Sequence, residues 1–171
     1  MRLTPQVVCR SHLREGLSMI EWVVVFHVMA GAAWFGGQVY IEGLMATAGR
    51  TKDTTTILTI ARTSVKTSVR VFSGAAILLL ITGVWIVLDG STPFAFEDMF
   101  VSIGFLIVLI GLGLVLFYFR PKGASLDAAI AEQGLTSTDA LATAKQISMV
   151  SHIMTLLVTI ALIVMVLHTG M

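Results

Sequence analysis

The chain has 171 residues, of which 56% are hydrophobic and 12% charged, with a net charge of +1 and a mean hydropathy of +0.92. Soluble domains usually have about 25% charged residues, so the composition excludes an ordinary water-soluble domain and favours a lipid environment. The near-neutral charge, without a basic stripe interleaved with aromatic residues, excludes a nucleic-acid-binding protein, and the single Cys9 excludes an internal disulfide.

The first membrane span is predicted over residues 19–41. Residues 1–18 carry three arginines but lack the apolar core of a cleavable signal peptide, and Met19 is an alternative start of the chain. The segment that follows, "MIEWVVVFHVMAGAAWFGGQVYI", meets the length of about 20 apolar residues that a helix needs to cross a bilayer.

Further segments of the same character predict three more spans, at residues 71–88, 99–119 and 147–167. They are continuous apolar runs and not the alternating runs of a membrane β-barrel, so we expect helices. The chain is therefore predicted to be all-α, a single four-span membrane domain over residues 1–171 that forms a four-helix bundle.

The connections between the spans also carry helical signals. Residues 53–69 place apolar side chains at helical spacing, which predicts an amphipathic cytoplasmic extension of the second span. Residues 124–146 predict a short helix, a break at Gly134 and a helix capped near Ser137 that leads into the fourth span. Acidic residues in this second connection are expected on its solvated face: Asp127, Glu132 and Asp139.

Basic residues predict the orientation of the spans. Eight of them lie in the first and third connections, at Arg50, Lys52, Arg62, Lys66, Arg70, Arg120, Lys122 and Lys145. The second connection has none and holds Asp89, Glu97 and Asp98. Because basic loops stay in the cytoplasm, we expect the first and third connections in the cytoplasm and both termini outside. We expect a bacterial inner-membrane protein, so the outside is the periplasm.

Polar residues form a stripe along the first span. His27, Gly31, Trp34, Gln38 and Glu42 follow at steps of three or four, which places them on one helix face. Unpaired polar groups are costly in lipid, so this face is predicted to point towards the other helices. Glycines in three spans are predicted to allow close helix approach: Gly36, Gly37, Gly74, Gly83, Gly104, Gly111 and Gly113.

His27 is the first candidate ligand, because neutral imidazole binds copper, haem iron or zinc. The alternative is a structural histidine that only bonds to a neighbouring helix. As a ligand it needs a partner for its other ring nitrogen. Gln38 is about three turns away, so a hydroxyl or carbonyl of another span must supply this partner.

The fourth span adds two methionine–histidine pairs, Met149 with His152 and Met165 with His168, the latter followed by Met171. Thioether and imidazole form the ligand set of Cu(I), and they also bind haem. The alternative is that these methionines fill apolar volume.

Depth separates the two pairs. His27 and His152 differ in depth by roughly 12 Å at the helical rise, too far to bind one metal together. An outer site of His27 with Met165 or His168 is compatible with the depths, and His152 with Met149 would form a separate inner site.

The motif H-x6-W-x-G, formed by His27, Trp34 and Gly36 and followed by Gly37, resembles the first span of CopD-type copper-resistance membrane proteins and their uncharacterised four-span bacterial relatives. This resemblance implies copper handling at the inner membrane, with His27 as a ligand. A weaker similarity to HemJ-type protoporphyrinogen oxidases implies haem b, although Glu42 stands where the oxidases usually have a basic residue.

Three hypotheses for function follow from these observations. The favoured one is a membrane protein, more a binding protein than an enzyme, that binds or passes copper through a bundle lined by histidine and methionine. The first alternative is a haem-b redox protein with His27 and Trp34 at the cofactor, either oxidase-like or linked to quinone. The second is a membrane subunit without a cofactor, whose polar stripe only fixes the helix register.

Overall fold

The computed structural model describes residues 18–169, and all of its regular elements are helical. They are, in chain order, α1 (Met19–Thr51), α2 (Thr54–Leu88), α3 (Met99–Leu114), the π-helical turn η1 (Val115–Phe119), α4 (Arg120–Gln133) and α5 (Thr138–Thr169). No strand occurs between residues 18 and 169, so the prediction of an all-α protein is confirmed. Cys9, the arginines of the N-terminal segment and Met171 lie outside the described residues.

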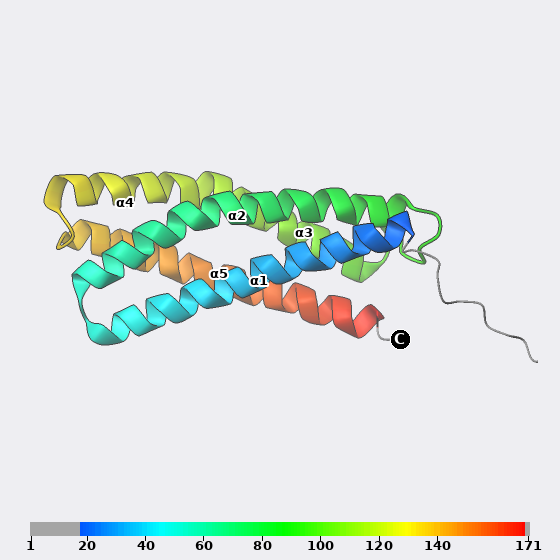
Figure 1. The fold of residues 1–171 in the computed structure, drawn as a ribbon, viewed down its shortest axis with the longest axis horizontal. Coiled ribbons are helices and arrows are strands. Elements are labelled where there is room, and N and C mark those ends of the chain that lie inside the picture. The colour runs from blue at the N-terminus through cyan, green and yellow to red at the C-terminus, as the bar shows by residue number, and fades with distance from the viewer. Residues whose placement is uncertain (1–17, 170–171) are drawn as a thin grey trace, which may run out of the picture.

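The helices form an elongated bundle in which α3, η1 and α4 follow one another as a single helical run (Figure 1). Four helical runs are long and apolar enough to cross a membrane, and each contains one of the predicted spans. The chain is therefore a multi-pass integral membrane protein. The most extensive helix contact is that between α1 and α2.

The helices are longer than a bilayer requires. α1 has 33 residues and α2 has 35. At a rise of 1.5 Å per residue they measure about 50 Å, against about 30 Å for the hydrocarbon core. We call the end with the α1–α2 and α4–α5 connections the basic end, and the end with the α2–α3 connection the acidic end. The basic residues of α1, α2 and α4 lie in the half of the bundle towards the basic end, so we expect the excess helix length to protrude from the membrane there.

The connections at the basic end are tight and capped. Lys52 adopts a left-handed conformation with φ of 55° after α1, and the Asp53 side chain then accepts hydrogen bonds from the first backbone N–H groups of α2. The α4–α5 connection breaks at Gly134, where φ is 77°, and the Ser137 hydroxyl accepts from the Ala140 N–H at 3.1 Å. The helical extension of the second span, the break and the cap are confirmed.

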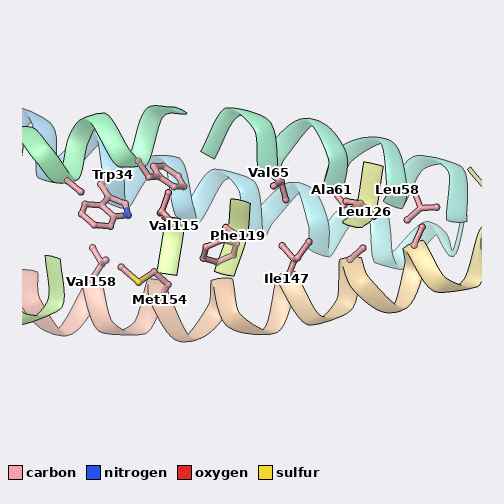
Figure 2. Packing of buried hydrophobic residues seen from close by; sticks show 14 of the residues in the cluster. Trp34, Leu58, Ala61, Val65, Val115, Phe119, Leu126, Ile147, Met154 and Val158 are labelled. Atoms are coloured by element: carbon pink, nitrogen blue, oxygen red, sulfur yellow. The ribbon is translucent and has the colours of Figure 1, made fainter. Parts of the chain in front are cut away.

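One expected solvated side chain has ionic partners instead. Asp127 of α4 lies 2.6 Å from Arg62 Nε and 2.9 Å from Lys66 Nζ, both on α2. Glu132 is exposed, as expected, and the Asp139 carboxylate accepts from Gln133 Nε2 at 3.1 Å. The ion pairs join α2 to α4 above an apolar layer that includes Leu58 and Leu126, both fully buried (Figure 2).

The π-helical turn η1 was not expected from the sequence, and Pro121 explains its place. Proline has no N–H to donate to the carbonyl four residues earlier, here that of Phe117, and its ring clashes with that carbonyl. The helix widens in the turn directly before this proline. Its Val115 and Phe119 side chains point into the bundle and are buried.

The glycines act differently from the prediction. A Cβ atom at Gly37 would lie 2.8 Å from the Phe72 ring, and one at Gly104 would lie 2.5 Å from Met165 Cε. These glycines, together with Gly83 and Gly111, make room for large side chains of neighbouring helices and not for their backbones. The positions at Gly36, Gly74 and Gly113 are open, so close approach there is not observed.

Candidate functional site

The polar stripe of α1 faces the other helices, as predicted. Trp34 is 2% exposed and Gln38 4% exposed, while His27, Gly31 and Glu42 are half-buried. The opposite face of α1 is apolar and exposed, as expected for contact with lipid. The stripe therefore brings its polar atoms into the bundle at two separate levels, one around His27 and one around Trp34.

The His27 ring is held by Thr82 of α2, with Nδ1 and Oγ1 2.8 Å apart. The Thr82 hydroxyl donates its only proton to the carbonyl of Leu78 at 2.6 Å. His27 Nδ1 must then carry the hydrogen and donate it to Thr82, which leaves Nε2 as an unprotonated lone pair. The expected hydroxyl partner from another span is thus present, on the second span.

Gly83, the neighbour of Thr82, makes room for the same ring. A Cβ atom at this position would lie 3.3 Å from His27 Cε1 and 3.5 Å from Phe105 Cζ of α3. Sequence reasoning considered Gly83 only as a packing residue and did not identify Thr82. Counting depth along antiparallel helices would have found it, because Thr82 lies six residues before the end of α2 and His27 eight after the start of α1.

Met165 and His168 of α5 lie towards the acidic end. The methyl group of Met165 packs onto Gly104, next to Phe105 in α3. The His168 ring is exposed and stacks on Phe100 at a centroid distance of 5.4 Å. Its Nδ1 donates to the Val164 carbonyl at 3.1 Å, so in the neutral ring Nε2 also carries a lone pair.

Met149 and His152 are not brought towards His27. Met149 is 64% exposed, and the exposed His152 donates from Nδ1 to the Ser148 carbonyl at 2.6 Å on its own helix. This pair lies on the side of α5 that points away from the bundle. Within residues 18–169 no three histidine, cysteine or acidic side chains converge.

The second polar level surrounds Trp34. Its ring stacks on Phe72 of α2 at 6.4 Å, and its Nε1–H is buried without a hydrogen-bond partner among the described residues. Towards the basic end, Gln38 Oε1 accepts from Ser151 Oγ at 3.3 Å, and Glu42 Oε1 accepts from Thr155 Oγ1 at 2.5 Å. Both bonds join α1 to α5.

A cavity of about 40 Å³ lies at this level between α1, α2, η1 and α5. Its polar lining includes serines that the sequence reasoning missed: Ser64, Ser68, Ser148 and Ser151. The signal was present, because these serines recur at helical spacings of four and three on two adjacent helices.

The size of this cavity bears on the cofactor. Pockets for cofactors and drug-sized ligands measure about 300–1,000 Å³, so a haem does not fit inside this cavity, which His27 does not line. A single metal ion bound by side chains at His27 requires no such volume. Comparisons of the chain with protein-family models, with curated proteins and with solved structures found no match.

Proposed function

We propose that this membrane protein binds copper as Cu(I) near its acidic end, with His27 Nε2 as the first ligand. The observation that carries the proposal is the hydrogen bond between His27 Nδ1 and Thr82 at 2.8 Å. Metal-binding histidines usually donate their other ring N–H to such a partner, which fixes the tautomer and the ring orientation. Here Thr82 donates its own hydroxyl proton to the Leu78 carbonyl and therefore accepts from His27 Nδ1. The lone pair available to a metal is then on His27 Nε2.

The donors at the acidic end favour copper over other metals. Met165 offers a thioether and His168 a second imidazole, and soft thioether ligands select Cu(I). A structural zinc site would require four cysteine, histidine or carboxylate ligands. The likeness of the His27–Trp34 motif to CopD-type proteins supports the same ligand chemistry.

The basic residues support an orientation in which the basic end lies in the cytoplasm and the copper ligands near the periplasmic surface of an inner membrane. In this orientation the protein would take up copper from the periplasmic side. A copper ion transferred through the bundle would have to pass the layer of side chains around Trp34.

Competition for Cu(I) tests this proposal. The purified protein in lipid nanodiscs is titrated against a chromogenic Cu(I) chelator, and the absorbance in the Soret region is recorded on the same sample. We expect stoichiometric copper in the wild type, loss of copper in His27→Ala, and wild-type binding in His152→Ala, which alters only the outward side of α5.

The other outcomes separate the alternatives. A Soret band that disappears in His27→Ala would support a haem protein. If the copper content and the haem content are each the same in the wild type and in His27→Ala, the remaining hypothesis is a membrane subunit without a cofactor.

A further inference from the structure

The cavity next to Trp34 is independent of the His27 site. It lies on the basic side of Trp34 and extends as far as Ala61 and Ala144. The Trp34 ring, Phe72 and Met154 form a layer that closes it towards the acidic end, where Gly111 leaves room for both Trp34 and Met154. His27 lies on the other side of this layer, about two helical turns away.

Trp34 defines what the cavity must bind. Its side chain is 2% exposed, and its Nε1–H has no acceptor among the described residues. Figure 2 shows the indole nitrogen on the side of the ring that faces Val115 and Phe119, both of which line the cavity. A buried N–H donor without an acceptor carries the full penalty of desolvation, so the occupant must accept a hydrogen bond.

The acceptor oxygens of the polar stripe that line the cavity, on Gln38 and Glu42, each already have one hydrogen-bond donor. Gln38 Oε1 accepts from Ser151, and Glu42 Oε1 accepts from Thr155, at the point where α1 and α5 cross (Figure 1). The amide group of Gln38 and the second oxygen of Glu42 remain for an occupant that can both accept and donate.

Water fits the volume and the chemistry. A water molecule requires about 10–15 Å³ of such a cavity and two to four polar partners, so about 40 Å³ accommodates a small cluster. A cation is disfavoured because it would face the positive end of the indole N–H. An anion is disfavoured because it would lie beside the Glu42 carboxylate in a cavity that no lysine, arginine or histidine lines.

We propose that the cavity is a hydration site, in which two or three ordered waters accept from Trp34 Nε1–H and join it to Gln38, Glu42 and the lining serines. These waters bridge α1, α2 and α5 inside the membrane-embedded bundle. His27 lies on the other side of the Trp34 layer and does not line this cavity.

Nuclear magnetic resonance of the full chain tests the proposal. The protein is labelled with ¹⁵N-tryptophan in nanodiscs, and transfer of magnetisation from water to the indole N–H groups is measured. The chain has three tryptophans, and Trp34→Phe identifies the Trp34 signal. We expect a water cross-peak at Trp34 despite its burial.

Matched serine variants on α2 locate the water. Ser68→Leu fills the cavity and should abolish the cross-peak, whereas Ser73→Leu, outside the cavity lining, should keep it. Ser151→Val serves the same purpose if Ser68→Leu does not fold. Absence of the cross-peak in the wild type, its persistence in both cavity variants, or an indole shift that follows chloride concentration would overturn the proposal.

Discussion

At the scale of single residues, the His27 imidazole depends on two neighbours in α2 with different functions. Thr82 fixes the tautomer by accepting from Nδ1, and Gly83 leaves the space in which the ring lies. The sequence was sufficient to identify His27, because a histidine in an apolar span is rare and costly. It was insufficient for Thr82, because a lone threonine in a span can bond to its own helix, as this one also does.

Thr82→Val removes the hydroxyl and keeps the side-chain shape. His27 Nδ1–H then loses its acceptor in apolar surroundings, which should lower the free energy of unfolding by about 1–3 kcal/mol. Loss of a partner of this kind should weaken copper binding about 10–100-fold. Thermal unfolding measures the change in stability and Cu(I) competition the change in affinity. Thr82→Ser keeps the hydroxyl, so both stability and affinity should return towards the wild-type values. Wild-type stability and affinity in Thr82→Val would show that the bond is not required.

Gly83→Ala tests the space at the ring, with Gly74→Ala on the same helix as the control. An added methyl group at Gly74 meets open space, so that variant should gain about 0.5–1 kcal/mol from helix propensity. At Gly83 the methyl group lies 3.3 Å from His27 Cε1, so the ring must shift against its bond to Thr82. We expect no gain in melting temperature and weaker copper binding. Equal behaviour of the two variants would contradict this packing.

At the scale of elements, the positions of the spans were predictable from the sequence. The local distortion of a span and the contacts between spans were less so. Continuous apolar runs specify membrane helices, and Asp53, Gly134 and Ser137 specify the turns at the basic end. The π-helical turn was missed because a proline after a span reads equally well as a helix end. The partners of the glycines were missed because a sequence shows the absence of a side chain and not which neighbour occupies the space.

Gly111→Ala tests the layer that closes the cavity. A Cβ atom there would lie 2.7 Å from the Trp34 ring and would also meet Met154, so we expect overpacking that costs about 1–3 kcal/mol. Gly113→Ala, two residues along the same helix, meets nothing and should be neutral or stabilising. Denaturation of both variants in the same detergent gives the comparison. A Gly111→Ala protein as stable as the Gly113→Ala protein would exclude the tight layer.

At the scale of the whole molecule, the bundle has a polar asymmetry. Asp127 pairs with two cations of α2 towards the basic end, while His27, Met165 and His168 lie towards the acidic end. From this asymmetry the positive-inside rule predicts an orientation with the basic end in the cytoplasm. The proposed copper ligands and the proposed waters then lie on opposite sides of the Trp34 layer.

Cysteine labelling tests the orientation in intact spheroplasts. In a Cys9→Ser background, Thr92→Cys in the α2–α3 connection should react with an impermeant thiol reagent, and Lys52→Cys should react only after lysis. Both positions lie in connections between helices; Lys52 is exposed and Thr92 half-buried, so the labelling of each variant after lysis serves as its own reference. Labelling of Lys52→Cys but not Thr92→Cys before lysis would reverse the orientation.

X-ray absorption spectroscopy of the copper-loaded protein tests the central claim most directly, because it reports the atoms bound to the metal. We predict Cu(I) with imidazole and sulfur scattering, the imidazole contribution reduced in His27→Ala and the sulfur contribution lost in Met165→Leu, a volume-conserving change. His152→Ala, on the outward side of α5, should leave the spectrum unchanged. A spectrum that is identical in the wild type, His27→Ala and Met165→Leu would contradict the account.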